Sequence, residues 1–186
     1  MAIDDLIQDA TRRMDKSVEA AQAEFATLRT GRASPALLDR VQIDYYGQRT
    51  PLKQLATINA PEPRLLTIQP FDPNSVSAIE RAIQESDLGL TPSNDGKLIR
   101  LPIPQLTEER RKELVKVVRG MAEDGRVAVR NVRRDVMHHL KELVDKGEAG
   151  KDEEHRAEER VQKLTDEHTH KIDELLKRKE AEILEV

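Results

Sequence analysis

A helical repeat between about Thr107 and Lys146 constrains the fold of this chain more than any other feature. Apolar side chains recur there at steps of three and four residues, which places them on one face of a helix. Seven residues make up this predicted face: Leu114, Val118, Met121, Ala128, Val132, Val136 and Leu143. A helix with one apolar face gains most of its stability by packing, so we expect other helices to cover it.

Basic side chains occupy a separate stripe of the same predicted helix, about 100° wide. The stripe consists of Lys112, Lys116, Arg119, Arg126, Arg130, Arg133, Arg134 and Lys141. Residues 107–146 carry 11 basic and 8 acidic groups, whereas residues 147–186 carry 8 and 13, and the whole chain has a net charge of −4. Positive charge concentrated on one helix of an acidic protein favours site-specific binding of a polyanion.

The chemistry of the stripe favours RNA as that polyanion. Arginine outnumbers lysine in its central part, and the planar guanidinium group matches the geometry of phosphate. Few acidic residues lie close by in the sequence, Glu123 and Asp135 being the exceptions. No recognition-helix motif or row of aromatic residues is present, so shape and phosphate contacts to structured RNA are expected. A solvated helix face without a binding role is the competing interpretation.

Two more amphipathic helices are predicted, at residues 2–29 and at about 152–184. The first should end at Thr30-Gly31, and Gly147–Gly150 should separate the other two. Three such helices predict a long antiparallel three-helix bundle, formed by residues 1–30 and 106–186.

Residues 31–105 lack the helical period and form a predicted small β/α/β domain inserted into the bundle. Alternation at Val41–Tyr46 indicates a strand, Gly47-Gln48 a turn, and Asp72–Ser75 the start of a short helix. The fold class is therefore α+β and mainly helical. The two short connections at Thr30–Ser34 and Pro102–Leu106 predict a hinge between the domains.

Sequence motifs argue against catalysis by this chain. Cysteine is absent, and neither a phosphate-binding loop nor a nucleophile or zinc-protease motif occurs. Among the histidines, His168 lies on the apolar stripe of the last helix, where a packed core residue is expected. We predict no enzyme activity, cofactor or metal. No apolar run reaches the roughly 18 residues of a membrane helix, and the acidic start is no signal peptide, so a cytoplasmic protein is expected.

Four stretches carry a resemblance to a known family. They read RTGRASP from Arg29, LTEERRK from Leu106, VRNVRRD from Val129 and VQKLTD from Val161. Together they resemble ribosome recycling factors of the bacterial type, and the similarity covers the whole chain. The family is usually richer in alanine near Gly125, where a glycine should cost about 1 kcal/mol of helix stability.

The resemblance implies an L-shaped molecule similar in outline to transfer RNA. It implies a monomeric translation factor that binds the post-termination 70S ribosome, chiefly through large-subunit ribosomal RNA. With elongation factor G and GTP used by that partner, it would split the subunits and release messenger RNA and deacylated transfer RNA. The RNA-contacting residues would be Arg130 and Arg133, with Arg110, Arg126 and Arg134. The hinge would comprise Thr30, Gly31, Arg32, Ser34, Pro35, Pro102 and Pro104.

Two other classes of protein remain compatible with the sequence. A coiled-coil adaptor would self-associate through its apolar stripes, which sedimentation would detect. An RNA chaperone would bind naked structured RNA as well as it binds ribosomes.

Overall fold

The structure is a computed structural model that describes residues 2–185. Its contacts divide the chain into two compact units. The helical unit contains the chain up to Leu28 together with Lys112–Glu185, and the small unit contains Arg29–Arg111. The first boundary falls at residue 28 rather than 30, and the second at 111 rather than 105.

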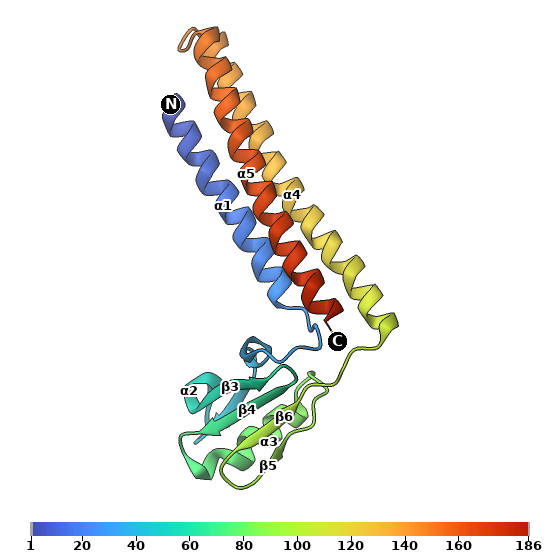
Figure 1. Ribbon diagram of the computed structural model, residues 1–186. Coiled ribbons are helices and arrows are strands. Elements are labelled where there is room, and N and C mark those ends of the chain that lie inside the picture. The colour runs from blue at the N-terminus through green and yellow to red at the C-terminus, as the bar shows by residue number, and fades with distance from the viewer. Residues whose placement is uncertain (1, 186) are drawn as a thin grey trace. The chain divides into compact units, whose positions relative to one another are not determined.

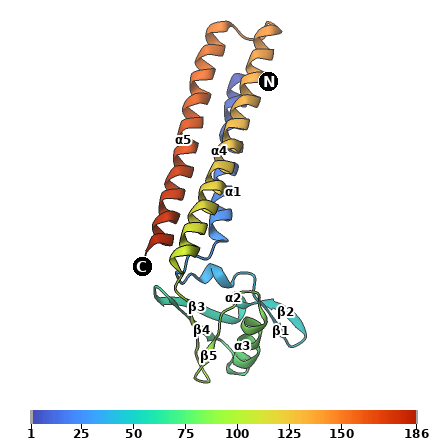
Figure 2. The ribbon, with the colours of Figure 1, turned by 90° about the vertical axis from the view of Figure 1, so that its right-hand side faces the viewer.

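Three long helices form the helical unit: α1 (Ile3–Ala26), α4 (Glu108–Asp145) from Lys112 onward, and α5 (Lys151–Leu184). They lie side by side over much of their length (Figures 1 and 2). The connection after α4 reverses the chain, so α4 and α5 are antiparallel, whereas α1 and α5 run in the same direction. The prediction of a mainly helical α+β chain with a helical bundle and a small sheet domain is confirmed.

Local chemistry sets both ends of α4 where the sequence indicates. The backbone N–H of Arg110 donates to the Thr107 hydroxyl at 3.1 Å, the hydrogen bond of an N-cap. At the other end Gly147 has a φ of +74°, a conformation that suits glycine. Its neighbour Glu148 donates its N–H to the Leu143 carbonyl at 2.9 Å. The predicted cap and stop of this helix are therefore confirmed.

The inner face of α4 differs in part from the predicted one. Ala122, Gly125, Val129 and Leu140 are buried, whereas the expected Met121, Ala128 and Leu143 are only half-buried. The buried face is therefore turned slightly about the helix axis from the predicted one, and the helices approach closely at Gly125. A Cβ atom at Gly125 would lie 3.1 Å from Ile172 Cδ1 on α5 and 3.2 Å from Ala21 Cβ on α1. The glycine thus marks a point where all three helices meet.

Two features of α1 and α5 complete the bundle. α1 ends at Ala26, before the predicted residue 29, because Thr27 caps it with backbone and hydroxyl hydrogen bonds to the Glu24 carbonyl. His168 of α5 is 2% exposed, which confirms the prediction of a packed histidine. Its Nε2 lies 2.7 Å from the Asp15 carboxylate of α1, so it fastens α5 to α1.

The small unit contains two antiparallel sheets. Strands β3 (Ala56–Glu62), β4 (Leu65–Pro70), β6 (Ile99–Pro102) and β5 (Ser93–Asn94) form one sheet in that spatial order. β1 (Gln42–Tyr45) and β2 (Gln48–Pro51) form the other. Helix α3 (Val76–Glu85) follows a turn of 3₁₀ helix, η2 (Pro73–Ser75), and buries Ile79 and Ile83 in the same core as Leu66 and Ile68.

Short elements of this unit depart from the predictions. The hairpin turn is Tyr46-Gly47, with φ values of +50° and +81°, rather than Gly47-Gln48. Two positive φ values suit the right-handed twist of a two-residue hairpin. The 3₁₀ helix η1 (Pro35–Leu38) and the single-turn helix α2 (Leu52–Leu55) were not predicted, because pieces this short carry no periodic signal.

Candidate nucleic-acid interface

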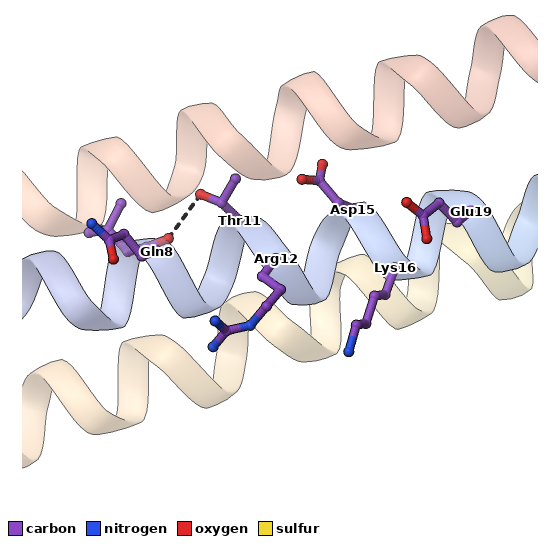
Figure 3. Close-up of a pocket in the computed structure, with 7 residues that line it drawn as sticks. Gln8, Thr11, Arg12, Asp15, Lys16 and Glu19 are labelled. Atoms are coloured by element: carbon purple, nitrogen blue, oxygen red, sulfur yellow. Dashed lines mark hydrogen bonds between the residues drawn. The ribbon is translucent and has the colours of Figure 1, made fainter.

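A surface hollow of about 440 Å³ lies along α1 (Figure 3). The residues that line it all belong to that helix: Ile7, Gln8, Thr11, Arg12, Asp15, Lys16 and Glu19. Their polar groups do not converge, since Thr11 and Asp15 point to one side and Arg12 and Lys16 to the other. Asp15 is engaged by His168 and Arg12 by Asp9. The hollow therefore lacks the convergent polar groups of a binding site.

Two arginines of the basic stripe pair with acidic residues of α5 at a regular spacing. Arg119 Nε lies 2.7 Å from Glu180 Oε1, and Arg126 Nη1 lies 2.6 Å from Asp173 Oδ1. Each pair is seven residues from the next on both helices, in opposite directions, as antiparallel packing requires. We call these two pairs the closed rungs, because each guanidinium group already forms an ion pair with a carboxylate of α5.

Arg126 and Arg130 share a further acidic partner within α4. Glu123 accepts from Arg126 Nε at 3.1 Å and from Arg130 Nη1 at 3.3 Å. These hydrogen bonds, with that from Arg126 the stronger, hold the pKa of the Glu123 carboxyl below its ordinary value. Arg126 is therefore in contact with two carboxylates and Arg130 with one.

The next position of the same repeat has a different arrangement. Seven residues beyond Arg126, Arg133 would meet Asp166, but its Nη1 instead donates to the neutral Gln162 Oε1 at 3.3 Å. Among residues 2–185, no carboxylate pairs with Arg133, and the exposed Arg134 has no charged partner. We call Arg133 and Gln162 the open rung, because its positive charge is not neutralised.

The structure thus separates the five predicted RNA-contacting residues into groups. Arg126, Arg130, Arg133 and Arg134 lie within nine residues of α4, with the neutralised ones first and the un-neutralised ones last. Arg110 lies in the first turn of the helix, roughly four turns earlier. The roles of Gln162 and Asp173 were missed, whereas Glu123 was named from the sequence as an acidic neighbour of the stripe. The seven-residue spacing of Asp166, Asp173 and Glu180 was the signal that could have revealed the pairing with α4.

The predicted hinge residues lie in the small unit, where backbone hydrogen bonds hold both connections. Ala33 donates its N–H to the Pro63 carbonyl at 2.6 Å, and Ile103 donates to the adjacent Arg64 carbonyl at 2.8 Å. Both connections are thereby fixed to the turn between β3 and β4. Thr30 is buried, Ser34 and Pro35 begin η1, Pro102 ends β6, and Arg32 and Pro104 are exposed.

Gly31 is the conformationally restricted point of the first connection. Its φ is +76°, and a Cβ atom there would lie 3.0 Å from Leu106 Cγ on the second connection. A side chain at residue 31 would therefore be strained and would press on Leu106.

Comparison with known proteins assigns the chain to a family. A family model described as ribosome recycling factor matches residues 21–184. The chain belongs to the ribosome recycling factor family. The ribosome-recycling factor of Rubrobacter xylanophilus is 61% identical over 180 residues, which is 97% of each chain. That of Halalkalibacterium halodurans is 57% identical over 182 residues, or 98% of each chain.

Solved structures agree with this assignment. A solution structure of the ribosome recycling factor superposes with a TM-score of 0.80 at 45% identity, covering 100% of this chain and 99% of the other. A second is described as models for the T. thermophilus ribosome recycling factor and the E. coli elongation factor G bound to the E. coli post-termination complex. It matches with a TM-score of 0.70 at 49% identity, over the full length of both chains. Within residues 2–185, no helix is long and apolar enough to cross a membrane.

Proposed function

We propose that this chain binds the post-termination ribosome and, together with elongation factor G and GTP, separates the ribosomal subunits. Messenger RNA and deacylated transfer RNA are released for reuse. The GTP is hydrolysed by elongation factor G, and this chain supplies a rigid RNA-binding bundle and a small unit that the partner displaces.

Arg133 and Arg134 of α4 are the observation that carries this proposal. Arg133 and Arg134 present guanidinium groups that no carboxylate of the described chain neutralises. Charged hydrogen bonds from arginine to phosphate provide both affinity and orientation. The proposal also draws on the related structure, whose description places a ribosome recycling factor and elongation factor G on a post-termination complex.

A subunit-splitting assay tests the proposal. Post-termination 70S ribosomes are mixed with the chain, and dissociation is followed by light scattering with and without elongation factor G and GTP. Splitting is expected only with both, and Arg133→Ala should require about tenfold more protein for the same rate, since one charged hydrogen bond is worth about 1.5 kcal/mol. Arg119→Ala is the matched control and should behave like the unmodified chain. Equal splitting without the partner, or by Arg133→Ala, would contradict the proposal.

The role of the connections is tested separately. Gly31→Val forces a β-branched residue into a positive φ and against Leu106. We expect ribosome binding to be nearly unchanged and splitting to be impaired, since the helical unit binds and the connections transmit motion. Gly89→Val is the matched control, because Gly89 has a φ of +66° in the same unit but nothing within 4 Å of a Cβ atom. Normal splitting by Gly31→Val, or equal impairment by both variants, would contradict the hinge.

A further inference from the structure

The open rung continues into a polar relay from Gln162 to Asp166, about one turn along α5. Gln162 accepts from Arg133 with its Oε1 at 3.3 Å and donates from its Nε2 to Asp166 Oδ1 at 2.9 Å. The amide therefore lies between a guanidinium group and a carboxylate. In the closed rungs the corresponding contacts are direct, at 2.7 Å for Arg119 and 2.6 Å for Arg126.

The orientation of the amide follows from the charge of Asp166. A side-chain amide has donors at one end and an acceptor at the other, and an ionised carboxylate only accepts. Asp166 therefore holds the NH₂ group, which leaves the carbonyl oxygen facing Arg133. Arg133 is therefore oriented by a neutral acceptor. The carboxylate of Asp166 lies on the other side of the Gln162 amide and does not contact Arg133.

This arrangement orients the guanidinium group without neutralising it. Gln162 is the hydrogen-bond partner of Arg133 among residues 2–185, so four of its five N–H donors remain for a ligand. A carboxylate in the position of Gln162 would orient Arg133 equally well but would compete with phosphate for it. The neutral amide of Gln162 therefore orients Arg133 and leaves its positive charge available to bind an anion.

We propose that Gln162, oriented by Asp166, is a positioning residue that holds Arg133 for contact with an RNA phosphate. The inference rests on the proposed function, since it concerns the same RNA-binding surface. It assigns a role to two residues of α5 that do not themselves contact the phosphate.

A charge-conserving exchange tests the relay. The double variant Gln162→Glu, Asp166→Asn moves the negative charge next to Arg133 and leaves the net charge of the chain unchanged. Affinity for vacant 70S ribosomes should fall about fivefold, and the slope of log affinity against log salt should decrease by up to about 1. Far-UV circular dichroism and the thermal midpoint should stay the same, because both positions are exposed on a helix.

The same exchange in an Arg133→Ala background shows whether Gln162 acts through Arg133. A relay predicts no further loss of affinity there, whereas independent effects would add. Unchanged affinity and salt slope in the exchange variant, or an equal loss in both backgrounds, would overturn the role of Gln162. Normal ribosome binding by Arg133→Ala alone would overturn the proposed RNA contact itself.

Discussion

The closed rungs and the open rung lie on one stripe of one helix, yet their arginines have different surroundings. Arg119 and Arg126 face carboxylates of α5, whereas Arg133 faces an amide. The ion pairs of Arg119 and Arg126 contribute to holding α4 against α5. The charge of Arg133 is not neutralised by a carboxylate and can pair with an anionic partner. The difference teaches that a basic stripe read from one helix is not yet a binding site, because the neighbouring helix decides which charges are neutralised.

Charge reversal should separate the two kinds of rung most strongly. Arg133→Glu should lose about a hundredfold in ribosome affinity, because it removes a charged hydrogen bond and adds repulsion from phosphate. Arg119→Glu should lose no more than about threefold, and its main cost is repulsion of Glu180, on the order of 1 kcal/mol of stability. Equilibrium binding to 70S ribosomes measures both, and equal losses would remove the distinction between the rungs.

Much of the helical unit could be predicted because its signals are local. The Thr107 cap and the Gly147 stop of α4 depend on nearby residues, and the periodicity of α5 alone placed His168 on a packed face; all three predictions were correct. The pairing of Arg126 with Asp173 depends on residues 47 positions apart, which only the packing of two helices brings together. Single-helix periodicity could locate the stripe but could not distinguish neutralised arginines from un-neutralised ones.

The predicted apolar stripe of α4 is turned slightly about the helix axis from the buried face. Met121, Ala128 and Leu143 were expected inside, whereas Ala122, Gly125, Val129 and Leu140 are buried instead. Gly125 could not be recognised as a core residue because it has no apolar side chain. Glycine at residue 125 lowers the helix propensity of α4, but it allows close contact with Ala21 of α1 and Ile172 of α5.

Two glycines of α4 provide the next test, which compares two faces of the helix. Gly125 lies on the buried inner face, and Gly120 is exposed next to Arg119 of a closed rung. Gly120→Ala should raise the free energy of unfolding by up to about 1 kcal/mol, because nothing lies within 4 Å and alanine favours helix. Gly125→Ala should lower it by about 1 kcal/mol, since Ala21 Cβ cannot move without its backbone. Urea denaturation measures both. If both substitutions stabilise the chain, the close approach at Gly125 is not required.

Opening a closed rung should have a smaller effect. Asp173→Asn removes one of the two carboxylates that contact Arg126, whose side chain is 21% exposed. Ribosome affinity should rise about twofold to threefold, because one more guanidinium charge becomes available to phosphate. Glu174→Gln makes the same charge change on α5, and Glu174 pairs with His170 and with no arginine among residues 2–185. Equal tightening by both variants would indicate a general charge effect rather than release of Arg126.

The smallest effect is expected on the α1 side of α4, where Arg13 Nη1 lies 2.6 Å from Asp135 Oδ2. The hydrogen bond from Arg13 lowers the pKa of the Asp135 carboxyl below its ordinary value. The pair therefore stabilises the fold above the ordinary pKa of aspartate, about 4, and this stabilisation is lost as pH falls through the lowered value.

Asp135→Asn should cost about 0.5 kcal/mol or less at pH 7, because both side chains are partly exposed and solvent screens the pair. The difference from the unmodified chain should shrink below about pH 4. Thermal unfolding across pH measures it, with ribosome affinity unchanged. A difference that grows at low pH would contradict the assignment.

The salt dependence of ribosome binding tests the central claim most directly. Affinities of the unmodified chain, Arg133→Ala and Arg119→Ala are measured across a salt series, and log affinity is plotted against log salt. Each phosphate contact contributes up to about 0.9 to the slope. The slope for Arg133→Ala should therefore be shallower by roughly that amount, and the slope for Arg119→Ala should match the unmodified chain. Three equal slopes would show that the open rung does not contact phosphate.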